Sequence, residues 1–284
     1  DPQLIGNTFR FTIKATLKEA ENRGALWLGG TFHKAPSEKP ITDSKLNAAI
    51  RLTGMDIHHY LPYIGNRASI EQLTGRLDME TTVSGTVSEF TSKGSVTAKN
   101  AIIHYPHAFR APLRPRTLHL NYVLTRNAGD LNLEVVRLVV DRVAIAGRFS
   151  LRDMDKDDPL LSATAASSTF PLTEMHAYIP WGIIPQGVGR FIEEHVTGGD
   201  FRLIEGKLQG RLSEITDMMK QENASALSIR AEVKNGVFLV GAGDKTPDFQ
   251  DISGSLELKN RQFFFRNITG RFGSSPCRRS EERR

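Results

Sequence analysis

The sequence has a single cysteine, Cys277, among its 284 residues, and only two tryptophans. One cysteine excludes an internal disulfide and a metal site built from several thiolates. No stretch approaches the roughly 18 uninterrupted apolar residues of a membrane-spanning helix, because charged side chains interrupt even the most apolar region, residues 131–149. The chain also begins at Asp1 within a strand-like pattern and carries no signal peptide. We therefore expect any export signal or membrane anchor to lie upstream.

The sequence also lacks a large excess of positive or negative charge. The 37 Lys and Arg residues nearly balance the 32 Asp and Glu residues, which leaves a formal net charge of +5. Basic residues are interspersed with acidic ones and form no basic stripe with interleaved aromatic side chains. Because such a stripe is typical of proteins that bind nucleic acid, we expect no nucleic acid among the partners.

The chain carries no complete motif for catalysis or metal binding. The acidic loop at residues 153–159 would need Gly and Glu at its sixth and twelfth positions to bind calcium as an EF-hand does, but Asp158 and Thr164 stand there. A proline between His104 and His107 forbids the regular helix of a paired ligand site. No Gly-x-Ser-x-Gly motif occurs. We therefore predict that the protein is not an enzyme and has no catalytic residue, cofactor or metal.

Alternation of apolar and polar residues dominates the sequence. It runs through residues 9–17, 118–124, 143–149 and 227–233, among others, with short turn signals between the runs. Alternation with a period of two indicates strands that are apolar on one face only, and short connections indicate antiparallel meanders. Helical patterns are few and short, at residues 55–64, 172–179 and 188–197. The predicted fold is mainly β, with repeated antiparallel meanders that form a long curled sheet or groove and a few short helices.

The chain also contains an internal repeat. Residues 46–48, 83–90 and 98–103 recur in the same order as residues 161–163, 208–215 and 233–238. Repeats of this kind indicate a duplicated structural unit. We divide the chain into the end of a preceding β unit (1–45), a first groove repeat (46–160), a second groove repeat (161–273) and a disordered or artefactual tail (274–284).

The apolar face of each strand must be covered, and the alternating pattern is compatible with two kinds of cover. In a β-sandwich or barrel, two faces cover each other around a dry core. In an open trough, the hydrocarbon of a bound lipid covers the face instead. Few helices and only two tryptophans favour the trough. Strand parity then assigns the following residues to the lining: Leu77, Val87, Leu120, Leu133, Ile145, Leu208, Leu212, Ile229, Val233, Leu256 and Phe265.

Five segments, taken in order, resemble the AsmA-like superfamily of Gram-negative envelope proteins, and most closely its large YhdP-type members. They are residues 172–180 (LTEMHAYIP), 204–212 (IEGKLQGRL), 231–237 (AEVKNGV), 249–258 (FQDISGSLEL) and 268–272 (ITGRF). Each motif is degenerate, and the order and spacing of the motifs carry the resemblance, which covers residues 46–273.

The resemblance implies a function and a location. Proteins of this type are implicated in moving phospholipid along a repeating β-groove between the inner and outer membranes, and in outer-membrane integrity. It implies a periplasmic, non-enzymatic conduit segment that an upstream anchor holds to the inner membrane, with phospholipid acyl chains and envelope proteins as partners. The alternative is a β-sandwich-like scaffold module that supports outer-membrane biogenesis without carrying lipid.

Overall fold

The structure is a computed structural model, and it describes residues 3–5, 7–18, 23–60, 70–182, 184, 186–218, 220–239 and 248–279. Strands make up 66% of the chain. The expected fold class is confirmed, because the protein is mainly β, its strands form open antiparallel meanders and its helices are short.

The strands are long, and most are joined by tight turns. They are β1 (Gln3–Ile5), β2 (Thr8–Lys18), β3 (Arg23–His33), β4 (Lys45–Asp56), β5 (Gln72–Gly85), β6 (Glu89–His104), β7 (Thr117–Asn127), β8 (Asp130–Val140), β9 (Val143–Arg152), β10 (Leu160–Ser167), β11 (Phe170–Pro171), β12 (Val196–Arg211), β13 (Leu227–Leu239), β14 (Asp248–Lys259), β15 (Gln262–Phe272) and β16 (Ser275–Arg279).

Within the described ranges, seven short helical segments accompany the strands. They are η1 (Ile41–Asp43), η2 (Ile57–Tyr60), α2 (Leu172–Met175), η3 (His176–Tyr178), α3 (Gln186–His195), α4 (Leu212–Thr216) and η4 (Gln221–Ala226). The helices expected near residues 172–179 and 188–197 correspond to α2 with η3 and to α3. The prediction of a helix at residues 55–64 is wrong for residues 55 and 56, because β4 continues to Asp56. Residues 57–60 are helical and form η2, and residues 61–64 lie outside the described part of the chain.

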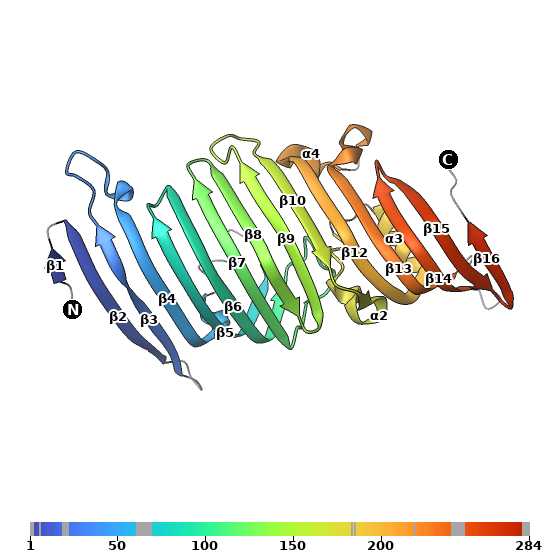
Figure 1. Cartoon of the computed structure of the whole chain (residues 1–284), viewed down its shortest axis with the longest axis horizontal. Helices are drawn as coiled ribbons and strands as arrows, with labels where there is room; N and C mark the ends of the chain where they lie inside the picture. Colours follow the sequence, from blue (N-terminus) through green and yellow to red (C-terminus); the bar gives the residue numbers. More distant parts are fainter. Residues whose placement is uncertain are drawn as a thin grey trace. The chain divides into compact units, whose positions relative to one another are not determined.

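The chain forms two compact units. Unit 1 comprises residues 1–105 and 112–159, and unit 2 comprises residues 106–111 and 160–284. In unit 1 the strands β1 to β9 pair in chain order, as Figure 1 shows. In unit 2 the order is β10, β12, β13, β14, β15 and β16, with β11 paired to β12. Within the described residues, neither sheet closes on itself.

Two stretches of the chain differ from the expected division. Residues 25–33 pair with β4 and therefore belong to the same sheet as the strands that follow. At the other end, residues 275–279 form the strand β16 and pair with β15. The expectation of a disordered tail is wrong for these five residues, and residues 280–284 lie outside the described part of the chain.

The two units share their strand register. Ala48 pairs with Val83 in unit 1, and Ala163 pairs with Leu208 in unit 2. These are the positions that the internal repeat matches in the sequence. The repeat therefore reflects a common pairing pattern as well as common residue types.

A β-bulge also recurs at matching positions. Asn100 (φ 50°) and Gly75 (φ 122°) form it in unit 1, and Asn235 (φ 54°) and Gly199 (φ 125°) form it in unit 2. A Cβ atom on either glycine would lie 2.8 Å from a Cα atom of the neighbouring strand. Only glycine fits such a close approach at positive φ. These two glycines are therefore required by the backbone conformation of the bulge.

Candidate functional site

An unbroken apolar row crosses the sheet of unit 1 from β2 to β9. Directly paired residues of antiparallel strands point to the same face, so the register defines the row. Its members are half-buried, and none of them is fully buried. They are Ala15, Leu26, Leu52, Met79, Val96, Leu120, Leu138 and Ile145. We call the face that bears this row the lining face of unit 1.

The opposite face of the same sheet is polar. Arg51 and Glu80 form an ion pair across β4 and β5, and Thr97 contacts the His119 ring nitrogen at 2.9 Å across β6 and β7. Cross-strand pairs of this kind stabilise a water-facing sheet surface. The sheet of unit 1 therefore has one polar face and one apolar face.

The apolar side chains find little cover within the protein. The chain exposes 18179 Å² of surface, whereas two globular domains of about 17 and 15 kDa would together expose about 14,800 Å². Among the described residues, the buried apolar side chains are mostly small or medium-sized, and the largest that is fully buried is Pro115. Packed cores are filled mainly by large aliphatic and aromatic side chains. The lining faces are thus left largely open to a guest molecule.

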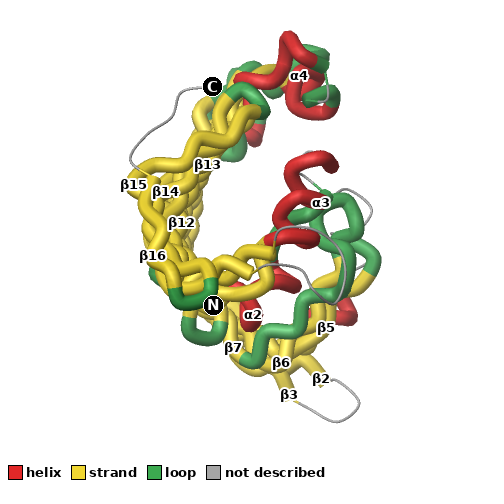
Figure 2. The backbone as a smooth tube through the Cα atoms, turned by 90° about the vertical axis from the view of Figure 1, so that its right-hand side faces the viewer, coloured by secondary structure: helices red, strands yellow, loops and turns green. Residues whose placement is uncertain are grey.

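An apolar groove of about 420 Å³ lies in unit 2. Its wall comes from strands β12 to β16, and α3 contributes Ile192. Figure 2 shows β12, β13 and β14 bent into an arc, with α3 on the inner side of the arc. Of the residues that line this groove, only Arg278 is charged. Five of them are phenylalanines, namely Phe201, Phe238, Phe249, Phe263 and Phe265.

Nine of the eleven residues assigned to the lining by parity lie on two sheet faces. In unit 1 the register places four on the lining face: Leu77, Leu120, Leu133 and Ile145. In unit 2 it places five on one face: Leu208, Ile229, Val233, Leu256 and Phe265. The last three of these line the groove. We call this face the lining face of unit 2.

The other two assigned residues are not on strands, so their assignment is corrected. Val87 lies in the turn between β5 and β6 and is 60% exposed, and Leu212 begins α4 and is 41% exposed. Local hydrogen bonds end the strands there. A backbone N–H donates to the Thr86 hydroxyl at 3.0 Å in unit 1, and the Arg211 N–H donates to the Glu214 carboxylate at 2.7 Å in unit 2.

Strand parity found Phe265 but missed the other four phenylalanines of the groove. Phe201 lies on the lining face of unit 2 because it pairs with Val233. Register shifts separate Phe238 and Phe249 from the alternating residues of β13 and β14, so simple alternation cannot assign them. The positive-φ residue Asn235 marks one of these shifts, and an Asn-Gly pair in a strand pattern is a sequence signal for it.

One group of hydroxyls interrupts the lining face of unit 1. The Tyr122 hydroxyl contacts the Thr81 hydroxyl at 2.9 Å and the Ser92 hydroxyl at 3.2 Å. Tyr122 and Thr81 lie two strands apart, on either side of Gly94, so the tyrosine ring must lie across the sheet. Thr81 and Ser92 are accordingly buried although their face is open. Their polar groups are satisfied, and the ring presents an apolar surface above them.

Helix α3 is anchored beside the groove by residues 106–111. Arg110 pairs with Glu193 of α3 and lies over the Trp181 ring, 5.4 Å from its centroid. The Trp181 indole is buried and donates to the His176 carbonyl oxygen at 3.2 Å. These contacts fix the position from which α3 reaches the groove.

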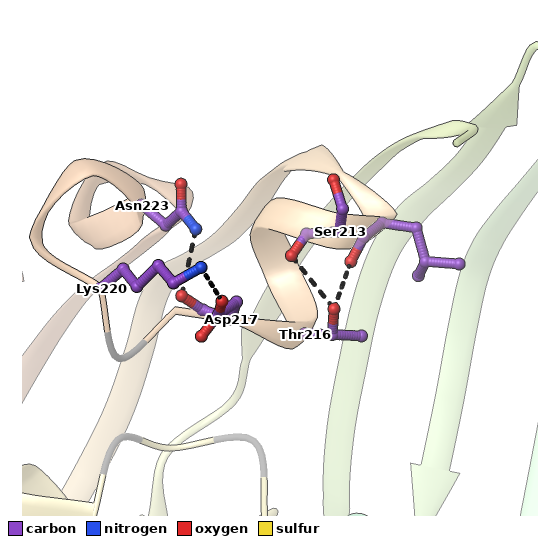
Figure 3. Close-up of polar contacts among 6 residues, drawn as sticks. Ser213, Thr216, Asp217, Lys220 and Asn223 are labelled. Atoms are coloured by element: carbon purple, nitrogen blue, oxygen red, sulfur yellow. Dashed lines mark hydrogen bonds and ion pairs between the residues drawn. The ribbon is translucent and has the colours of Figure 1, made fainter. Parts of the chain in front are cut away.

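A second helical segment follows β12, where unit 1 has only a turn. The Thr216 hydroxyl donates to the Leu212 carbonyl oxygen at 3.0 Å, and the Asn223 amide donates to the Asp217 carbonyl oxygen at 3.1 Å (Figure 3). A hydrogen bond from Lys220 to Asp217 and the charge of that carboxylate raise the pKa of Lys220. Met218 and Asn223 of this segment line a small pocket together with Leu227 and Leu258, which lie on the lining face of unit 2.

Other kinds of site find no support in the described part of the chain. No three His, Cys, Asp or Glu side chains there lie close enough together to hold a metal ion. No helix in the described ranges has both the length and the apolar character needed to span a membrane. No protein-family model, curated protein or solved structure matches this chain.

Proposed function

We propose that this chain is a non-enzymatic segment of a lipid conduit of the AsmA-like, YhdP type. It carries phospholipid acyl chains along its lining faces between the inner and outer membranes of a Gram-negative bacterium, in the periplasm, and so supports outer-membrane integrity. An upstream segment anchors the full-length protein in the inner membrane.

One observation carries this proposal: the apolar row of half-buried side chains that crosses eight strands of unit 1. At about 4.8 Å per strand the row spans roughly 34 Å, similar to the hydrocarbon thickness of a bilayer, which is about 30 Å. Removing a sixteen-carbon chain from a bilayer costs on the order of 12 kcal/mol. A carrier must offset this cost at every point of the path, and a row without a charged gap does so.

The scaffold alternative requires the same side chains to be covered by protein. In a β-sandwich a second sheet packs about 10 Å above the first and buries the inner faces. Each unit here contains a single sheet within its described residues, and its apolar face is half-exposed. The lipid proposal accounts for that exposure, and the sandwich does not.

The proposal is tested by lipid content and lipid transfer. Native mass spectrometry of the purified chain should detect co-purified phospholipid, and the chain should transfer fluorescent phospholipid between vesicles. Ile145→Asp should abolish transfer, because it places a carboxylate on the apolar row. The matched control is Ala146→Asp, an exposed neighbour in β9, which should leave transfer intact.

Stability separates an open face from a closed core. Ile145 is half-exposed, so Ile145→Asp should cost only about 1–2 kcal/mol of unfolding free energy. A loss of 4 kcal/mol or more, which is typical of a charge placed in a dry core at about 3–5 kcal/mol, would contradict the open face. A wild-type chain that holds no phospholipid and transfers none would contradict the proposal itself.

A further inference from the structure

One charged residue lies on the lining face of unit 1. The register places Arg126 there, since it pairs with Phe90 on one side and Leu131 on the other. Among the side chains that the register places on this face from β4 to β9, Arg126 alone is charged. The other side chains on this face are apolar or carry hydroxyls, so the presence of a guanidinium there needs a physical explanation.

One nitrogen of this guanidinium finds no acceptor among the described residues. The Nε atom of Arg126 is buried and has no hydrogen-bond partner, and the described residues provide no ion pair for this side chain. A buried donor without a partner costs stability, and such groups in a native fold point to an absent ligand or to function. Arg126 therefore lacks an anionic or carbonyl acceptor.

Arg126 lies at the rim of the lining face. It is the penultimate residue of β7, and its neighbour Asn127 pairs with Asp130 to close the turn to β8. The apolar rows lie farther along the strands, beginning with the row that contains Leu124 and Leu133. A lipid with its acyl chains on those rows would bring its polar end to this rim.

We propose that Arg126 is a headgroup site that binds the phosphate of a phospholipid whose acyl chains lie on the lining face of unit 1. This inference rests on the proposed function and adds to it the chemical group by which the lipid is held. Phosphate suits the site because the planar guanidinium fork donates two parallel hydrogen bonds to phosphate oxygens and retains its charge at all relevant pH values. The neighbouring Phe90 and Leu131 are half-buried apolar side chains, and an apolar surrounding strengthens such a contact.

The test compares two lipids with the same acyl chains. Donor vesicles of phosphatidylcholine contain a small fraction of either pyrene-labelled phosphatidylglycerol or pyrene-labelled diacylglycerol, which has no phosphate. The measured quantity is the ratio of the two transfer rates to acceptor vesicles. Arg126→Met should lower this ratio by about tenfold, the effect expected from losing one charged hydrogen-bonded contact, while diacylglycerol transfer continues.

The matched control removes the same charge from the polar face. Arg137 is exposed on β8 and pairs with Asn121 on the face opposite to Arg126. Arg137→Met should leave the ratio unchanged. Arg126→Met should also preserve or raise the melting temperature, because it removes a buried donor without a partner. A clear fall in melting temperature would make Arg126 a structural residue and overturn the headgroup site.

The remaining outcomes separate the inference from the proposed function. An unchanged ratio in Arg126→Met, with both lipids still transferred, overturns the headgroup site and leaves the conduit intact. Failure of the wild-type chain to transfer either lipid overturns both. Inorganic phosphate is added in a further arm. If it slows phosphatidylglycerol transfer by the wild type but not by Arg126→Met, free phosphate competes with the lipid phosphate for Arg126, as the headgroup assignment requires. If phosphate raises the melting temperature of the wild type but not of Arg126→Met and leaves transfer unchanged, Arg126 binds free phosphate only, and the headgroup assignment is overturned.

Discussion

The groove of unit 2 offers the sharpest test of acyl-chain binding. Val233 lies in the wall of the groove and pairs with Phe201 and Gly254. Val233→Asp would place a carboxylate against any hydrocarbon in the groove. If the side chain covers three or four methylene groups, at about 0.8 kcal/mol each the substitution removes about 3 kcal/mol of binding. The affinity for a long-chain fatty acid should therefore fall about 100-fold.

The fold itself should tolerate this change. Val233 is half-buried on a face without a second protein layer, so the lost burial costs about 1 kcal/mol of unfolding free energy. Ser228→Asp is the matched control because it adds the same charge to the same strand. Ser228 pairs with Lys207 and Lys259 on the opposite face. An acidic side chain there should leave the free energy of unfolding unchanged or raise it slightly.

The assay uses the only cysteine of the chain. Cys277 lines the same groove, so a polarity-sensitive fluorophore attached there reports the arrival of hydrocarbon during a titration with palmitate. We expect saturable binding by the wild type and by Ser228→Asp, and about 100-fold weaker binding by Val233→Asp. Equal affinity in all three proteins, or unfolding of Val233→Asp, would refute the reasoning.

Two further predictions concern the shared architecture of the units. Gly75→Ala should cost about 2 kcal/mol or more of unfolding free energy, because φ is 122° there. Gly187→Ala, in the first turn of α3 with no atom near its Cβ position, should gain about 0.5 kcal/mol; equal effects in denaturant titrations would contradict this. Replacing residues 211–224 by the turn sequence of residues 86–89 should preserve the sheet of unit 2, as circular dichroism can check. An unfolded chimera would mean that the common register does not specify the fold.

Alternation and repetition in the sequence were sufficient to predict the fold class. A period-two pattern identifies the apolar face of a strand directly. For this reason nine of the eleven residues predicted to line the groove lie on the lining faces of the two units. The pattern failed at Val87 and Leu212, where alternation continues past the strand end by chance. At those points a hydroxyl or carboxylate that bonds the backbone decides the structure.

Arg126 was missed for a different reason. The alternating apolar residues of β7 end at Leu124, and the next position of the same parity carries a charge, so a hydrophobic pattern excludes it. Its place on the lining face follows only from its pairing with Phe90 and Leu131. A charged residue that occupies a lining position cannot be found from a hydrophobic pattern. Such positions are also where function is expected to override local preference.

The two units differ in lining chemistry although their register is the same. The row that bears Thr81, Gly94 and Tyr122 in unit 1 corresponds by pairing to Gly206, Ile229 and Leu258 in unit 2. Unit 1 thus offers a mainly aliphatic face with a tethered ring, whereas unit 2 offers a groove with five phenylalanines. A groove surrounds more of a bound chain than an open face does, and burial sets the binding energy. Acyl chains should therefore be held more strongly in unit 2 and exchange faster in unit 1.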